Sequence, residues 1–194
     1  MFINDLPEDI VSRTRLFADD CIVYRQINKK DDCATLQSDL RRLESWEKKW
    51  GMTFHPQKCS VMSITRSRSP IMHNYKLKGL TLSREHSTKY LGVDIQSNLQ
   101  WNDHIARITK KSNSILGFLR RNLKRTSEET KASAYKAMVR SNLEYCATVW
   151  SPHHKVQINK VEMVQRRAAR FTTNRYRNTS SVRNHLKVGE RKYS

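Results

Sequence analysis

The chain has 194 residues, of which 37 % are hydrophobic, and a net charge of +19 from 37 Lys and Arg against 18 Asp and Glu. No apolar run reaches the roughly 18 residues that a membrane span needs, and the N-terminal MFINDLPEDI has early acids in place of a signal peptide's apolar stretch. Four Trp, seven Tyr and five Phe are enough to form a core, which argues against a disordered chain.

Positive charge is concentrated in the C-terminal half. Residues 1–100 hold 16 basic and 12 acidic residues (16 − 12 = +4), whereas residues 101–194 hold 21 and 6 (21 − 6 = +15). This asymmetry predicts a polyanionic partner for the second half, with nucleic acid as the first candidate. An anionic membrane surface is the second candidate, and a basic chain that is merely soluble is the third reading.

The four cysteines indicate neither a disulfide framework nor a zinc ribbon, because no two of them form a CxxC pair. Cys146 with His153 and His154 matches no common metal-site spacing. A reducing intracellular compartment fits this cysteine usage.

The first hundred residues alternate between strand and helix patterns. β-Favouring runs at residues 16–17 and 21–24 enclose Ala18-Asp19-Asp20 and predict a hairpin with both carboxylates at its tip. A helix follows, with Asp31 or Asp32 as the cap of its N-terminus, Gly51 at its end and an apolar stripe of Leu36, Leu40, Leu43 and Trp50. Strands are predicted over residues 55–64, 75–77, 80–82 and 89–95, with Gly92 marking a bend or close contact in the last.

From Asn102 onward the spacing is helical. The first helix has the stripe Ile105, Ile108, Ser112, Ile115 and Leu119. A capping box of Thr126 and Glu129 begins the second, whose predicted buried face is Thr130, Ala134, Met138 and Val139. After Pro152 a third helix begins near Lys155, with the stripe Val161, Val164, Ala168 and Phe171. The whole predicts an α+β chain with strands and one helix over 1–100, basic helices over 101–173 and a polar tail over 174–194.

Asp19 and Asp20 have the clearest catalytic chemistry. Carboxylates suit Mg²⁺, which binds one or two protein carboxylates together with phosphate oxygens. Two such ions can activate an attacking hydroxyl and stabilise the leaving oxygen in phosphoryl transfer. An Asp-Asp turn is weak evidence by itself, because Asp favours turns through local hydrogen bonds.

The surrounding blocks are more specific than the pair itself. Residues 16–24 (LFADDCIVY) resemble the Phe/Tyr-Ala-Asp-Asp box of reverse transcriptases, and residues 2–7 (FINDLP) resemble the segment before it in jockey-like non-LTR retrotransposons of the LINE class. Residues 46–52, 55–62 and 90–93 resemble the next blocks, the last being the primer-grip hairpin, and residues 143–150 and 164–170 resemble the helical region that follows. The resemblance covers residues 1 to about 187 and implies a partial palm followed by a helical thumb.

The resemblance also implies residue roles. Asp19 would be the main metal ligand and Asp20 its neighbour, and Lys58 would lie near the phosphates of the incoming deoxynucleoside triphosphate. Tyr90, Leu91 and Gly92 would hold the primer end. The thumb would grip the duplex of RNA template and DNA primer by its phosphates, with Lys110, Lys111, Arg120, Arg121, Lys124 and Arg125 as candidates. The alternative is a solvated surface for Lys58 and these six residues, and an ordinary core strand for residues 89–95.

The family supplies a further aspartate upstream of the Asp-Asp box, and Asp5 and Asp9, which precede the box here, lie in a loop-like context that does not fit that role. We therefore expect a C-terminal fragment of an RNA-directed DNA polymerase that binds Mg²⁺ weakly and does not polymerise alone. Its first hairpin would be marginal without a sheet partner. The alternatives are a non-catalytic nucleic-acid-binding module derived from such an element, and an unfolded relic. We expect no membrane partner. Retrotransposition would imply access to the cytoplasm and the nucleus.

Overall fold

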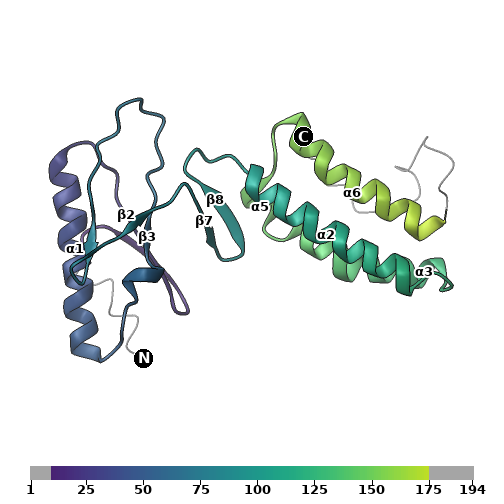
Figure 1. Cartoon of the computed structure of the whole chain (residues 1–194), viewed down its shortest axis with the longest axis horizontal. Coiled ribbons are helices and arrows are strands. Elements are labelled where there is room, and N and C mark those ends of the chain that lie inside the picture. Colours follow the sequence, from purple (N-terminus) through teal and green to yellow (C-terminus); the bar gives the residue numbers. More distant parts are fainter. Residues whose placement is uncertain (1–9, 175–194) are drawn as a thin grey trace. The chain divides into compact units, whose positions relative to one another are not determined.

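The computed structural model describes residues 10–174 and divides the chain into two compact units, residues 1–86 and 87–194 (Figure 1). The mixture of helices and short strands agrees with the predicted α+β class. The division lies before residue 87 and not near residue 100, where the composition changes, because strand β8 (Val93–Gln96) packs against helix α2 (Asn102–Asn122). Apart from Asn174, the predicted tail lies outside the described residues. No helix within residues 10–174 is long and apolar enough to cross a membrane.

The first unit combines one long helix with short two-stranded sheets. Strands β1 (Arg13–Phe17) and β2 (Asp20–Tyr24) form an antiparallel hairpin. Helix α1 (Lys30–Trp50) follows, and then the 3₁₀ helix η2 (Pro56–Lys58). The remaining strands are two residues long: β3 (Ser60–Val61) pairs in parallel with β6 (Ser83–Arg84), and β4 (Lys76–Leu77) pairs antiparallel with β5 (Leu80–Thr81).

Both ends of α1 follow the sequence prediction. The Asp32 carboxylate accepts hydrogen bonds from the backbone N–H groups of Asn28 (3.0 Å) and Lys29 (3.1 Å) at the start of the helix. These backbone bonds lower the pKa of Asp32. Gly51 ends the helix in the left-handed conformation (φ 67°), and its N–H donates to the Glu47 carbonyl at 2.9 Å.

Residues 55–64 do not form the continuous strand that their alternation predicts. Pro56 has no backbone N–H and begins η2. There the Lys58 N–H donates to the His55 carbonyl at 2.9 Å, and the Cys59 N–H donates to the Pro56 carbonyl at 3.1 Å. The strand prediction is therefore wrong outside β3, because local 3₁₀ bonds satisfy the backbone groups that a strand would pair.

The second unit is a hairpin followed by helices. The hairpin pairs β7 (Ser87–Tyr90) with β8, so the single strand predicted over 89–95 is in fact two strands joined by Leu91 and Gly92. After α2 come α3 (Glu128–Ala134), the π-helix η3 (Tyr135–Arg140), α4 (Ser141–Glu144), α5 (Ala147–Trp150) and α6 (Lys155–Thr173).

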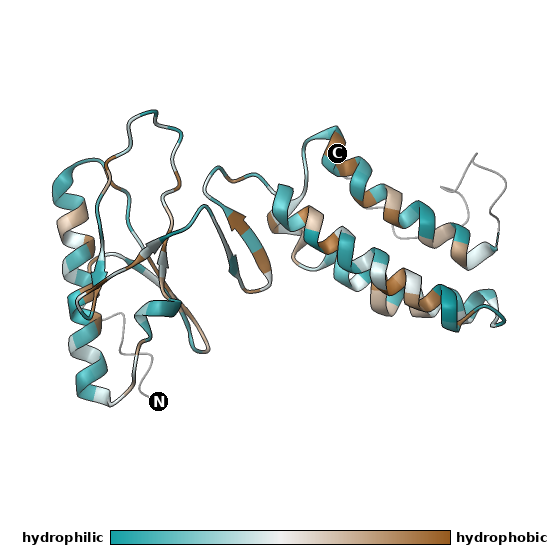
Figure 2. Ribbon diagram, in the orientation of Figure 1, coloured by the Kyte–Doolittle hydropathy of each residue, from teal (hydrophilic) through white to brown (hydrophobic). Residues whose placement is uncertain are grey.

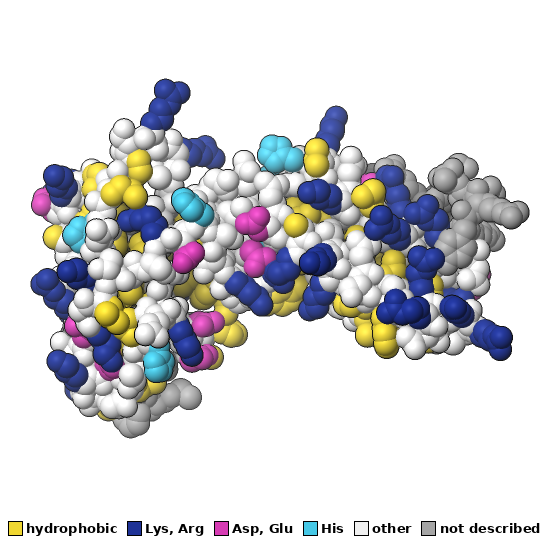
Figure 3. All heavy atoms as spheres, in the orientation of Figure 1, with side chains coloured by type: hydrophobic (Ala, Val, Ile, Leu, Met, Phe, Trp, Pro, Cys, Tyr) yellow, Lys and Arg dark blue, Asp and Glu magenta, His cyan; other side chains and the backbone are white. Residues whose placement is uncertain are grey.

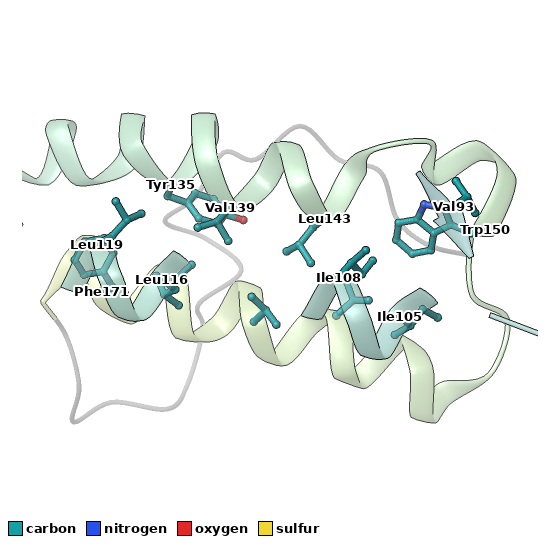
Figure 4. Packing of buried hydrophobic residues seen from close by; sticks show 13 residues of the cluster. Val93, Ile105, Ile108, Leu116, Leu119, Tyr135, Val139, Leu143, Trp150 and Phe171 are labelled. Carbon is teal, nitrogen blue, oxygen red and sulfur yellow. The ribbon is translucent and has the colours of Figure 1, made fainter. Parts of the chain in front are cut away.

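The helices of this unit bury an apolar cluster. Figure 2 shows apolar positions alternating with polar ones along α2, and Figure 4 shows the buried side chains of these helices facing one another. The predicted stripes of α2 and α6 lie in or against this cluster. It comprises Val93, Ile105, Ile108, Leu116, Leu119, Tyr135, Val139, Leu143, Trp150, Val161, Val164, Ala168 and Phe171, with Ile115 packed beside it.

The buried face of α3 and η3 lies one residue away from the predicted one. Ser127, not Thr126, caps α3, and its hydroxyl accepts from the Thr130 N–H at 3.2 Å. The buried positions are Lys131, Tyr135 and Val139, four residues apart, and Leu143 of α4 continues this spacing. Of the predicted face only Val139 is fully buried, whereas Met138 is 44 % exposed.

Candidate active-site hairpin and nucleic-acid interface

The aspartate pair lies where the sequence predicts it, at the tip of the β1–β2 hairpin. Ala18 and Asp19 form the two-residue turn, and Asp20 is the first residue of β2, opposite Phe17. Both carboxylates are exposed. Ala18 has a left-handed backbone (φ 51°), which costs a non-glycine residue on the order of 1 kcal/mol or more. The tight turn thus presents two neighbouring carboxylates to solvent on a strained backbone.

A buried carboxylate on α1 holds the start of this hairpin. Asp39 has 0 % exposure, and its two oxygens accept from the backbone N–H groups of Val11 (3.1 Å) and Ser12 (2.8 Å). Arg42 also donates to it at 2.9 Å. Burial by itself would raise the pKa of Asp39, but the bonds from Ser12 and Val11 and the Arg42 guanidinium hold it below its usual value.

Asp39 is a positioning residue that the sequence analysis missed. The sequence feature that could have revealed it is an acidic residue within the apolar stripe of α1, between Leu36 and Leu43. Such a position normally holds an apolar side chain, so a buried acid there indicates a structural hydrogen-bonding role.

The carboxylate oxygens of Asp19 and Asp20 are the type of donor that hard divalent cations prefer, so the pair fits part of a metal-ligand set. Within residues 10–174, no group of three or more His, Cys, Asp or Glu side chains is arranged to hold a metal ion. The arrangement therefore supplies two adjacent oxygen ligands from one hairpin.

Lys58 lies at the end of η2, in the same unit as the aspartates, and is exposed. In the described part of the chain, no ion pair joins it to Asp19 or Asp20. The structure therefore leaves Lys58 as a surface cation and does not bring it into contact with the carboxylates.

Tyr90, Leu91 and Gly92 lie at the tip of the β7–β8 hairpin, in the second unit. Leu91 and Gly92 form its two-residue turn with positive φ angles of 45° and 83°, and Tyr90 pairs with Val93. Two positive φ angles match the right-handed twist of the strands that such a turn joins. The turn that the resemblance implies is therefore present. Arg107 of α2 and Tyr145, just after α4, contact it, and the sequence analysis missed both.

The basic candidates of the helical unit are exposed. Lys110, Lys111, Arg120 and Arg121 lie on α2, and Lys124 and Arg125 follow it. Exposed Lys160, Arg166 and Arg167 lie on α6, and Arg167 donates to Asn113 of α2 at 2.9 Å, which joins the two helices. Figure 3 shows Lys and Arg side chains gathered over α2 and α6. We call these nine residues the basic surface.

Comparison with known proteins places this geometry in a family. Residues 1–95, which include the Asp19–Asp20 hairpin, match the family model of reverse transcriptase (RNA-dependent DNA polymerase). Residues 1–95 belong to the reverse transcriptase family. Residues 96–194, with α2 to α6, lie outside that match. No solved structure gives a significant match to the chain.

Curated retrotransposon proteins match more of the chain than the family model does. It is 28 % identical over 81 % of its length to the probable RNA-directed DNA polymerase from transposon BS of Drosophila melanogaster. It is 26 % identical over 79 % to the RNA-directed DNA polymerase from mobile element jockey of Drosophila funebris, and 25 % over 97 % to that of Drosophila melanogaster. The resemblance to jockey-like reverse transcriptases is thereby confirmed. The matched regions span 18 %, 17 % and 22 % of these relatives, about a fifth of their length.

Proposed function

We propose that this chain forms the Asp-Asp hairpin, primer-grip turn and thumb of an RNA-directed DNA polymerase of a jockey-like non-LTR retrotransposon. The observation that supports this most is the position of Asp19 and Asp20 at the tip of a hairpin within the reverse transcriptase region. In this proposal the first unit contributes to the palm and the helices α2 to α6 are the thumb. The polymerase would copy an RNA template by extending a DNA primer with deoxynucleoside triphosphates.

Asp19 and Asp20 would hold Mg²⁺ in the assembled polymerase, with Asp19, in the turn itself, as the main ligand. The metal would supply charge that activates the primer hydroxyl and stabilises the leaving phosphate oxygen. Asp39 contributes indirectly, because its bonds to Val11 and Ser12 fix the entry to β1. Lys58 would offset charge on the nucleotide phosphates.

The basic surface would hold the template–primer duplex by its phosphates, a contact that positions a duplex without reading its sequence. Its residues are exposed and come from α2, the turn after it and α6, and the Arg167–Asn113 bond joins the two helices. The excess of 21 basic over 6 acidic residues in residues 101–194 adds long-range attraction to such a duplex.

Binding of an RNA–DNA heteroduplex to the full chain tests this proposal. We expect log Kd to rise linearly with log salt between about 50 and 200 mM salt, because each phosphate contact releases counterions. Replacing Lys110, Lys111, Lys124 and Arg125 by Gln removes four contacts and lowers the slope by about 2 to 4. Fluorescence anisotropy of a labelled heteroduplex measures both quantities.

The matched control removes the same charge from the first unit, through Gln at Lys29, Lys30, Lys48 and Lys49, all exposed on or beside α1. We expect its slope to stay within about one unit of the wild type. An equal loss in both variants would mean that net charge and not the basic surface determines binding, which contradicts the proposal.

We predict that the 194-residue chain by itself is inactive as a polymerase. Its described residues provide only two candidate metal-ligating carboxylates, both on one hairpin, which is an incomplete set of ligands for Mg²⁺. A primer-extension assay with Mg²⁺ and a heteroduplex substrate measures this. Extension that is lost in Asp19→Asn would overturn the prediction.

A non-catalytic nucleic-acid-binding module is the second candidate function. The observation in its favour is that the exposed basic surface lies in a unit that contains neither Asp19 nor Asp20. The two functions differ at Asp19, which is essential for the polymerase in its intact context and has no role in a module that only binds.

A further inference from the structure

Both carbonyl groups of the β7–β8 turn are held by side chains from the helical part of the same unit. The Tyr145 hydroxyl donates to the Leu91 carbonyl at 2.9 Å, and the Arg107 guanidinium donates through Nη2 to the Gly92 carbonyl at 2.7 Å. Tyr145 lies 54 positions and Arg107 15 positions along the chain from these partners. The turn is therefore fixed by tertiary contacts as well as by its own strand pairing.

Arg107 is itself fixed by the hairpin that it holds. Its Nε donates to the Asp94 carboxylate at 2.5 Å, and the Asp94 N–H donates to Nδ1 of the buried His104 at 3.2 Å. A planar guanidinium can bond the carboxylate and the carbonyl together because its donors form a rigid fork. Burial and the neighbouring Arg107 lower the pKa of His104, so this ring acts as an acceptor for the Asp94 N–H at neutral pH.

Tyr145 is oriented from two sides. Its carbonyl accepts from the Trp150 indole N–H at 2.7 Å, and the next residue, Cys146, turns the chain with a left-handed backbone (φ 52°). A methyl group placed on Gly92 would come to 3.0 Å from the Tyr145 ring. Glycine at position 92 therefore allows both the positive φ angle of the turn and the close approach of the Tyr145 ring.

We propose that Tyr145 and Arg107 are positioning residues that orient the Leu91–Gly92 turn toward a phosphate of the primer strand; this rests on the proposed polymerase function. A carbonyl oxygen carries partial negative charge and repels phosphate. Here donors from Tyr145 and Arg107 occupy both carbonyls. Among the hydrogen bonds within residues 10–174, none uses the N–H of Leu91 or Gly92. The turn thus offers donors to an incoming anion.

Photocrosslinking with the full chain tests this proposal. The probe is an RNA–DNA heteroduplex whose DNA primer ends in 4-thiothymidine, and mass spectrometry locates the cross-linked peptide. The wild-type chain is expected to cross-link within residues 89–94. At saturating protein, Tyr145→Phe and Arg107→Gln each lower that cross-link about ten- to a hundredfold, because small displacements remove a contact that needs a defined geometry. Duplex affinity, which comes from the basic surface, changes by less than about threefold.

Conservative and matched variants separate positioning from charge and from folding. Arg107→Lys keeps the positive charge but lacks the planar guanidinium donors, so the cross-link is expected to stay low. Recovery to the wild-type yield would contradict positioning by Arg107. Gly92→Ala places a methyl group against the Tyr145 ring and lowers the cross-link without changing either donor. Tyr24→Phe and Arg41→Gln, exposed in the first unit, leave the yield unchanged.

The failures are distinguishable. A wild-type chain that binds no heteroduplex contradicts the proposed function, and this inference with it. A chain that binds heteroduplex but cross-links outside residues 89–94 contradicts the inference alone. A cross-link yield in Tyr145→Phe and Arg107→Gln equal to that of the wild type would also contradict the inference alone.

Discussion

Replacing Trp150 with Ala lowers the free energy of unfolding of the helical unit by about 3 to 5 kcal/mol, the usual cost of removing a large buried aromatic ring. Trp150 has 0 % exposure, its ring lies 5.0 Å from that of His104, and its indole N–H holds the Tyr145 carbonyl. The substitution therefore leaves a cavity and also removes a hydrogen bond beside the Leu91–Gly92 turn. Urea unfolding followed by far-UV circular dichroism measures the loss.

The neighbouring Val149 provides the control, because it lies on the same short helix but is 57 % exposed. Val149→Ala is expected to change the unfolding free energy by less than about 0.5 kcal/mol. If Trp150→Ala unfolds at the same urea concentration as Val149→Ala, Trp150 is not part of the core of this unit.

Replacing Asp39 with Ala weakens the β1–β2 hairpin by about 2 to 4 kcal/mol at neutral pH, because the N–H groups of Val11 and Ser12 lose their acceptor. The Arg42 contact adds less, since that side chain is 43 % exposed and screened by water. Hydrogen-exchange mass spectrometry of the full chain is the measurement, and protection of residues 11–24 is expected to fall about 30- to 1,000-fold.

The pH dependence of this effect has a defined sign. The pKa of Asp39 is lower in the folded than in the unfolded chain, so its contribution is complete above the ordinary Asp value of about 3.9. It is lost as the pH falls through the lower folded value. The difference between wild type and Asp39→Ala therefore persists down to about pH 4 and narrows below it.

Asp31 is the matched control for Asp39. It lies on the same helix, but its side chain is 81 % exposed and pairs with the exposed Lys29 at 3.4 Å. Asp31→Ala should leave the protection of the hairpin within about twofold of the wild type. Unchanged protection in Asp39→Ala would mean that α1 does not anchor the hairpin.

Local patterns were sufficient for the long helices. The stripe of α2 repeats over about four turns and that of α6 over about three, so single exceptions do not change which face is apolar. The face of α3 and η3 was predicted one residue away because Thr126 and Ser127 are both good caps, and the sequence does not distinguish them. The strand prediction for residues 55–64 was wrong because alternation alone does not reveal that Pro56 begins a 3₁₀ helix.

In the candidate site, too, local features could be predicted from the sequence and long-range contacts could not. The hairpin tip at Asp19 is a local feature, and the turn at Leu91–Gly92 came from the resemblance, which implied a hairpin where alternation predicted one strand. Asp39, Arg107 and Tyr145 act on partners 28, 15 and 54 positions away, and no local pattern encodes such contacts. Of the three, only Asp39 left a signal, as an acid within an apolar stripe.

The proposed role of Asp19 as a catalytic metal ligand of an RNA-directed DNA polymerase is tested most directly in a chimera. The jockey polymerase of Drosophila melanogaster aligns with 97 % of this chain, so the chain can replace the matching 22 % of that protein. We expect RNA-templated primer extension by the chimera and a loss of about a thousandfold in Asp19→Asn, with heteroduplex affinity retained. A chimera that binds heteroduplex normally but extends no primer, or that keeps its activity in Asp19→Asn, would contradict the claim.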